Sequence, residues 1–274
     1  MKTYSRTGFI SYSVAAFSLL TGTTSIKVQH VQRRIGLLLL LGFVAGMAPF
    51  ARAQYDPSAQ FSPVANPNGV WSYGFETVPL GSSFNLFTLA SPIPASPGPA
   101  IYSWLSAPVG TFMGVFDNGT AAVQTVTTGS SEISQFQPGM LAMNAGPNDE
   151  YAMVQFTAPV NGLYTIQGTF QGIDTASTVS SVYLLENNVV VASGSVLGFG
   201  PPSDVPLSSG PFLLSAGNTL AYAVGGISDN SMTALIDAQV AAVAVPEPSS
   251  SGAFALGVVA LVVRGWSCRK SVKL

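Results

Sequence analysis

The stretch YAMVQFTAPVNGLYTIQGTF, residues 151–170, decides the fold class of this chain. In its second half, Tyr164, Ile166 and Phe170 alternate with threonines and a glutamine. Because successive side chains of a strand point to opposite faces, this period of two predicts a sheet with one buried face. The first half, 151–157, predicts a second strand, and the Asn-Gly pair at 161–162 predicts a tight hairpin turn.

Short predicted strands continue on both sides of this stretch. No window has sustained helical periodicity with good caps, and β-branched and aromatic runs alternate with clusters of Gly, Pro, Asn and Ser. Further strands are predicted at 179–185, 189–193, 219–224 and 233–243, with weaker patterns at 70–75, 84–89, 101–105, 111–116, 121–127 and 139–143. Asn187 and Asn188 predict a hairpin turn, and the Pro-rich segments 91–99 and 200–211 predict loops. We therefore predict an all-β fold, a two-sheet antiparallel sandwich that is jelly-roll-like.

Positive charge is confined to the two ends of the sequence. All ten Lys and Arg residues, and the single histidine, lie before residue 53 or after residue 263. Residues 54–245 contain 11 acidic residues and no basic one, so this part carries a charge of about −11, although the formal charge of the whole chain is −2. The only cysteine, Cys268, lies near the C-terminus, so residues 54–245 can form no disulfide.

This composition excludes several kinds of chemistry from residues 54–245. Without His, Lys or Arg, the region cannot build a Ser-His-Asp triad, a Schiff-base nucleophile or a bidentate phosphate clamp. Zinc sites of the usual Cys and His type cannot form there either. Nucleic acid is not an expected partner, because binding it depends on cations that neutralise phosphates.

The first 53 residues predict an export signal. Arg33 and Arg34 precede an apolar run at 35–50, and Ala51 and Ala53 are small residues at the two positions that signal peptidase reads. We expect export through the Sec translocon and cleavage before Gln54, with twin-arginine export as the alternative. The expected organisation is a leader and signal peptide at 1–53, with a signal helix, an exported domain at 54–243 and a tail at 244–274.

The tail combines an acidic motif between two prolines, an apolar segment and a basic end. Pro246, Glu247 and Pro248 precede 15 uncharged residues, and Arg and Lys follow. As a helix, these 15 residues would reach about 22 Å, short of a hydrocarbon core of about 30 Å. Lys and Arg beyond the segment would hold that end in the cytoplasm. We predict a short transmembrane helix at about 251–266, and a permanent C-terminal membrane anchor is the alternative.

The order of these features resembles the PEP-CTERM sorting signal of bacteria, carried here by Val245, Pro246, Glu247 and Pro248. The resemblance implies that an exosortase-type membrane protease cuts near this motif. It also implies a route through the inner membrane to the cell envelope, the outer surface or the extracellular biofilm matrix of a Gram-negative-type bacterium.

Two phrases in the middle of the chain, at 154–164 and 214–220, resemble the β-sandwich ectodomains that precede such tails. Asn218 stands where that pattern often has an acidic residue. These ectodomains are similar to carbohydrate-binding jelly rolls. The resemblance therefore implies a non-enzymatic protein that binds extracellular polysaccharide.

Four aromatic residues are candidates for stacking on such a glycan. Trp71 and Tyr73 alternate along one predicted strand, and Tyr102 and Trp104 alternate along another. Aromatic faces pack well against the CH groups of a sugar ring. Packing in the core of the sandwich is the alternative, and the exposure of Trp71 with Tyr73 decides between the two.

The acidic residues suggest two further hypotheses. Asp174 and Asp229 lie in predicted loops and are candidate ligands of calcium, which takes six to eight oxygen ligands; solvated acids that keep the protein soluble are the alternative. A pair of carboxylates could also hydrolyse a glycosidic bond. The available glutamates, none paired on one strand face, are Glu76, Glu132, Glu150 and Glu186. We therefore expect no catalytic residue and no cofactor other than calcium.

Overall fold

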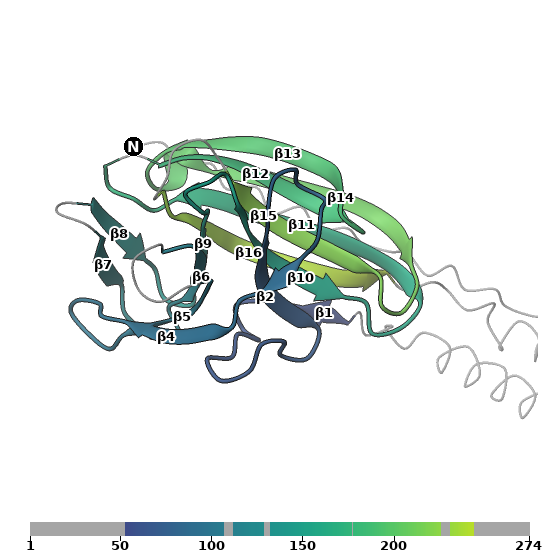
Figure 1. The fold of residues 1–274 in the computed structure, drawn as a ribbon, viewed down its shortest axis with the longest axis horizontal. Helices are drawn as coiled ribbons and strands as arrows, with labels where there is room; N and C mark the ends of the chain where they lie inside the picture. The colour runs from purple at the N-terminus through teal and green to yellow at the C-terminus, as the bar shows by residue number, and fades with distance from the viewer. Residues whose placement is uncertain (1–52, 107–111, 129–131, 177, 226–230, 244–274) are drawn as a thin grey trace, which may run out of the picture. The chain divides into compact units, whose positions relative to one another are not determined.

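Two antiparallel sheets face each other across a hydrophobic core in this protein (Figure 1). The computed structural model describes residues 53–106, 112–128, 132–176, 178–225 and 231–243. Within these ranges the chain forms strands β1 to β16 and one 3-10 helix, η1 (Pro201–Ser203). The predicted all-β class is confirmed.

The larger sheet has eight strands in the order β14-β11-β16-β9-β6-β5-β4, and β1 pairs with β16 outside this path. Its strands are β1 (Gln54–Tyr55), β4 (Leu89–Ile93), β5 (Ile101–Leu105), β6 (Gly114–Asp117), β9 (Leu141–Asn144), β11 (Gly162–Gly172), β14 (Val205–Leu214) and β16 (Thr233–Val243).

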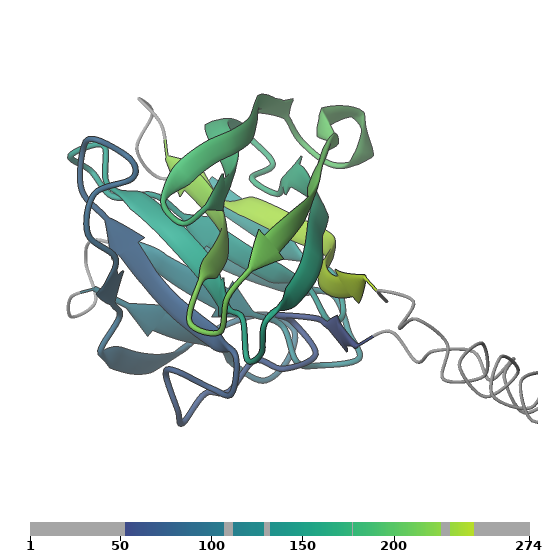
Figure 2. The ribbon, with the colours of Figure 1, turned by 90° about the vertical axis from the view of Figure 1, so that its right-hand side faces the viewer.

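The smaller sheet has six strands in the order β13-β12-β15-β10-β2-β3. Its strands are β2 (Trp71–Glu76), β3 (Asn85–Leu86), β10 (Tyr151–Thr157), β12 (Thr178–Glu186), β13 (Val189–Gly198) and β15 (Thr219–Gly225). A two-stranded ribbon, β7 (Gln124–Thr128) and β8 (Glu132–Phe136), forms a third sheet. Figure 2 shows the ribbon drawing of Figure 1 turned by 90°.

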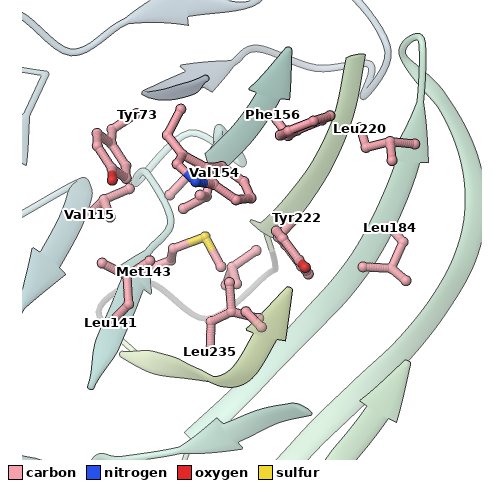
Figure 3. Close-up of a cluster of buried hydrophobic side chains, with 14 of the residues drawn as sticks. Tyr73, Val115, Leu141, Met143, Val154, Phe156, Leu184, Leu220, Tyr222 and Leu235 are labelled. Atoms are coloured by element: carbon pink, nitrogen blue, oxygen red, sulfur yellow. The ribbon is translucent and has the colours of Figure 1, made fainter. Parts of the chain in front are cut away.

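The main core lies between the inner faces of the two large sheets (Figure 3). The ring of Phe156 in β10 lies 5.5 Å from that of Trp71 in β2 and 5.6 Å from that of Tyr164 in β11, so it links the two sheets. All three side chains are fully buried. Since burial of one large apolar side chain contributes about 1.5–3 kcal/mol, this aromatic cluster is a main source of stability.

A second cluster lies on the outer face of the eight-stranded sheet, under the β7–β8 ribbon. Phe116 of β6 packs 6.5 Å from Phe136 of β8, and Val126 of β7 joins them. Strands β6 and β9 are therefore covered on both faces, which explains why all of their residues are buried.

Several local patterns are confirmed by the structure. The strands predicted at 101–105, 151–157 and 233–243 have these bounds, and Tyr164 and Ile166 alternate into the core along β11. Asn187 and Asn188 form the β12–β13 hairpin turn, with φ of 46° and 66°. Positive φ at both central residues is what the favoured two-residue hairpin turn requires, and asparagine tolerates it.

Other local predictions are wrong. The Asn-Gly pair at 161–162 does not close a hairpin, because β10 and β11 belong to different sheets. The Pro-rich segments contain strands: β4 includes Pro92, and β14 includes Pro206 and Pro211. Both strands lie at a sheet edge, where the missing N–H of proline faces no partner strand. Strands β1 and β8 have no counterpart among the predicted strands.

The predicted signal helix, the apolar helix at 251–266 and the sorting motif lie outside the described residues. The domain boundaries stay predictions, although β1 begins at Gln54 and β16 ends at Val243. None of the described segments forms a helix with the length and apolar character needed to span a bilayer.

Replacing Trp71 tests its place in the core. We expect Trp71→Ala to lower the free energy of unfolding by about 3–5 kcal/mol, because it removes a buried ring next to Phe156. Chemical denaturation measures this difference. Leu213→Ala, at a side chain that is 80% exposed on β14, is the control and should change stability by less than about 0.5 kcal/mol. Equal stability of the two variants would contradict the core role.

Candidate functional site

Three of the four aromatic candidates are core residues. Trp71 and Tyr73 are fully buried, and Trp104 is 7% exposed. The Trp71 Nε1–H donates to Gln60 Oε1 at 2.8 Å, and the Trp104 Nε1–H donates to the Ser62 carbonyl oxygen at 2.8 Å. The glycan-stacking hypothesis is therefore corrected for these three residues, since covered rings cannot meet a sugar.

Tyr102 is the remaining aromatic candidate. It lies on β5 next to buried Trp104, but its side chain is 48% exposed. A single exposed tyrosine does not form the predicted row of rings, so Tyr102 provides at most an isolated contact.

Only one of the two calcium candidates lies within the described residues. Asp174 follows β11 and is fully buried, whereas Asp229 lies outside the described ranges. The Ser134 hydroxyl and the Met232 backbone N–H each donate to the Asp174 carboxylate at 2.5 Å. Asp174 is thus neither the expected loop ligand nor a solvated acid. No group of three or more His, Cys, Asp or Glu in the described ranges could hold a metal ion.

The glutamates are the candidates for a hydrolytic pair. Glu76 is fully buried and accepts a hydrogen bond from the Gly81 backbone N–H at 2.7 Å. Glu150 accepts hydrogen bonds from the backbone and side chain of Asn148. None of the four glutamates lines the cleft described next.

A cleft of about 780 Å³ lies on the outer face of the eight-stranded sheet. Strands β11 and β16 supply its floor through Gln171 and Ile236, and three other segments border it: 56–59 after β1, 135–140 from β8 to β9, and 199–201 around η1. We call these the β1 wall, the β8 wall and the η1 wall. A volume of this size is typical of small-ligand and cofactor sites.

The lining combines amides, acids and a few apolar side chains. Its polar side chains are Asp56, Ser58, Gln135, Gln137, Gln171 and Asp237. Phe199, which is 40% exposed, and Ile236 add apolar surface. Amides both donate and accept hydrogen bonds, whereas carboxylates only accept them. The cleft therefore suits a ligand that carries many hydroxyl groups and some CH surface.

A β-bulge directs Asp237 into this cleft. The register of β11 against β16 shifts between the pairs Gln167–Gln239 and Thr169–Ile236, so Asp237 and its neighbour share one position opposite Gly168. Asp237 has φ of 50° and an exposed side chain. Bulges of this kind re-aim a side chain and often lie beside functional sites.

The η1 wall is fixed to the end of β11. The Gly200 N–H donates to the Gly172 carbonyl oxygen at 2.8 Å, and the Gly172 N–H donates to Ser203 Oγ at 2.9 Å. A Cβ atom at Gly172 would lie 2.1 Å from the Gly198 carbonyl oxygen, so only glycine allows this approach. The position of Phe199 is therefore set by backbone contacts.

The β8 wall is fixed in the same way. The Gln135 N–H donates to the Ile173 carbonyl oxygen, and the Thr175 N–H donates to the Ile133 carbonyl oxygen, both at 2.9 Å. These bonds tie β8 to the chain that leaves β11. They place the Gln135 side chain beside the floor of the cleft.

The β1 wall contacts a buried acid, Asp117, through Ser58. Asp56 Oδ1 accepts the backbone N–H groups of Ser58 and Ala59, and Ser58 Oγ donates to the Gly139 carbonyl oxygen at 2.5 Å. The same Oγ lies 3.4 Å from Asp117 Oδ1. Burial raises the pKa of Asp117 to about 6; the Ser58 contact opposes this, and the negative charge of Asp56 adds to it.

Sequence reasoning missed the residues that line the cleft. Gln135 lies in a strand that was not predicted and Gln137 directly follows it, and no local pattern connects them to Gln171. One signal was present at Asp237, which follows two apolar neighbours inside a predicted strand. Two successive apolar residues break the period of two, and such a break is typical of a bulge.

Comparisons with known proteins show weak similarity only. No family model and no curated protein matches the chain. Among solved structures, TmCBM61 in complex with β-1,4-galactotriose is 13% identical, with 43% of this chain and 81% of that one covered and a TM-score of 0.25. A CBM4 structure is 12% identical, with 50% and 92% covered and a TM-score of 0.28. A family 35 carbohydrate-binding module from Clostridium thermocellum is 17% identical, with 43% and 85% covered and a TM-score of 0.24.

Two buried carboxyl groups make stability depend on pH. Burial raises the pKa of Asp117 and of Asp174 to about 6, above the ordinary value of 3.8. The folded protein thus holds these protons more tightly than the unfolded chain does. Their contribution, up to about 3 kcal/mol each, is fully present below about pH 4 and is lost as the pH rises through about 6. We expect the free energy of unfolding to be higher at pH 4 than at pH 7.

Urea denaturation across this pH range measures the effect. Asp117→Asn and Asp174→Asn should each flatten the curve, whereas Asp149→Asn, at an exposed turn residue, should leave its slope unchanged. A wild-type protein that is more stable at pH 7 than at pH 4 would show that these acids are ionised without cost in the folded state.

Proposed function

We propose that this chain is an exported, non-enzymatic protein of the bacterial envelope or extracellular matrix that binds neutral polysaccharide in the cleft over β11 and β16. The observation that carries the proposal is the lining: side-chain amides and carboxylates from distant segments converge on one cleft, with apolar surface beside them. Such a combination matches the two surfaces of a sugar ring, its hydroxyl rim and its CH faces.

The construction of the cleft supports a binding role. Backbone hydrogen bonds fix the η1 wall to Gly172 and the β8 wall to Ile173, so the backbone of both walls is ordered before a ligand arrives. A site that is ordered in advance loses less conformational entropy on binding. Phe199 and Gln135, on two of the walls, are therefore expected to act as contacts whose backbone is fixed.

Charge favours a neutral glycan over an acidic one. No Lys, Arg or His is present between residues 54 and 245, and Asp56 and Asp237 line the cleft. A uronic acid or a sulfated sugar would meet carboxylates without any cation to pair with. Neutral hydroxyls, in contrast, can donate to both carboxylates.

The fold proposed with this function is a jelly-roll-like sandwich. From β9 onward the chain crosses repeatedly between the two large sheets: β10 and β12 belong to the six-stranded sheet, and β11 and β14 to the eight-stranded one. Repeated crossing of this kind is how a double-sheet jelly roll buries both inner faces.

The sorting route is proposed from the tail motif Val245 to Pro248, with support from the pairing of β1 with β16. Gln54 pairs with Ala241, and the Ala242 N–H donates to the Ala53 carbonyl oxygen at 2.9 Å. The predicted signal-peptidase site thus lies beside the end of β16, the strand that the predicted tail follows in sequence.

Binding is tested with the full-length chain and soluble galactans, glucans and mannans in isothermal titration calorimetry. Gln135→Ala and Asp237→Asn should each weaken binding about tenfold, the effect of one lost hydrogen bond to a hydroxyl. Tyr102→Ala is the matched control, since it removes an exposed aromatic side chain outside the cleft. Polyuronates should show no binding in the absence of calcium.

The outcomes separate the candidate surfaces. Loss of binding in Tyr102→Ala with unchanged cleft variants would move the site to β5 and reject the cleft. Stronger binding of polyuronates than of neutral polymers would reject the charge argument.

Processing is tested by mass spectrometry of the protein recovered from the producing cells. We expect an N-terminus at Gln54 and a C-terminus near Pro246 to Pro248, with loss of that cut when Glu247 is replaced by Ala. A stable membrane form that ends at Leu274 would instead establish the permanent anchor.

A further inference from the structure

The sheets of this protein end in strands that differ in how well their open edges are protected. The eight-stranded sheet ends in β14 and β4, and the six-stranded sheet ends in β13 and β3. An edge strand offers unpaired backbone N–H and C=O groups, and proteins usually block such an edge with proline, charge or short length.

Three of these four edges carry a block. Strand β14 contains Pro206 and Pro211, and β4 contains Pro92. Strand β3 has only two residues. Since proline cannot donate to a neighbouring strand and a two-residue strand offers few groups, none of these edges suits a long added strand.

Strand β13 has none of these three blocks, and its register against β12 is irregular only near its start, at Val191. It is ten residues long, VVVASGSVLG, with no proline and no charged residue, and among the described strands it pairs only with β12. Figure 1 shows it along the upper margin of the molecule. Ser193, Ser195 and Leu197 lie two residues apart on one face of the strand. All three are exposed, Leu197 by 65%.

The charge distribution indicates which kind of partner fits the edge of β13. The chain between Glu186 and Asp204 carries no charge, whereas the region 54–245 as a whole carries 11 acids and no cation. Two copies that approach through most of their surface repel each other, but repulsion is smallest where neither copy has a charge. An uncharged antiparallel edge is also complementary to itself about a two-fold axis, because its donors and acceptors alternate.

We propose that β13 is a self-association edge, along which a second copy of this chain adds its own β13 in antiparallel orientation. The two six-stranded sheets then form one continuous sheet across the interface. The inference does not depend on the cleft or its ligand, since β13 belongs to the six-stranded sheet and the cleft lies over the eight-stranded one.

The test is sedimentation equilibrium of the full-length chain in detergent, over a range of protein concentrations. The wild-type protein should show a concentration-dependent dimer. Ser195→Glu places a new acid from each copy at the interface and should raise the dissociation constant at least about tenfold. Ser208→Glu is the matched control, because it adds the same charge at an exposed serine of β14, the edge with prolines, and should leave the dissociation constant unchanged.

Hydrogen exchange provides a second measurement. Amides of β13 should exchange more slowly as the dimer forms, while those of β14 should not change. A protein that stays monomeric at every concentration would overturn the proposal. So would a dimer that persists in Ser195→Glu, which would place the contact elsewhere, such as the predicted tail. Thermal unfolding of both variants checks that each remains folded.

Discussion

The lack of any cation between residues 54 and 245 is the constraint on which the rest of this structure depends. A buried acid there cannot form an ion pair, so neutral groups have to satisfy it. Asp174 is held by the Ser134 hydroxyl and the Met232 backbone N–H, and Glu76 accepts a single backbone N–H from Gly81. Hydrogen bonds of this kind compensate only part of the cost of burying a charge. Asp174 consequently joins three segments that are distant in sequence, whereas the bond of Glu76 to Gly81 is local.

The cleft arises where the β7–β8 ribbon stops covering the eight-stranded sheet. Under the ribbon, β6 and β9 are buried on both faces, and the sheet has no free surface. Beyond β8 the outer face of β11 and β16 is open, and the ribbon edge becomes a wall. The bulge at Asp237 lies in this open part, where the re-aimed side chain lines the cleft instead of a second core. The cleft thus exists because the third layer, the β7–β8 ribbon, covers only part of the outer face of the eight-stranded sheet.

The sequence patterns predicted the class of structure well because strand alternation is a local property. Residues 151–157 and 233–243 have the predicted bounds, since a short apolar run bounded by turn residues is a signal of the local sequence. The same period of two could not reveal which face is buried. Trp71 and Tyr73 therefore fitted both a glycan platform and a core, and only the packing against Phe156 and its neighbours decides for the core. The prolines of β14 predicted a loop. They are tolerated because β14 is an edge strand, and that position depends on the topology, which the local sequence does not show. The cleft could not be predicted from the sequence for the same reason: the segments that form its walls come together only when the sheets have formed.

The position of β16 has a mechanical consequence. This strand ends at Val243, just before the predicted tail, and it lies inside its sheet, between β11 on one side and β9 with β1 on the other. A tether attached beyond Val243 would pull along the strand axis, so that the hydrogen bonds to β11, from Leu163 to Gly172, resist together in shear. A strand at an edge, pulled across its axis, would instead lose these bonds one at a time, as a zipper opens. The predicted tail therefore follows a strand whose hydrogen bonds would share a pulling force instead of breaking one after another.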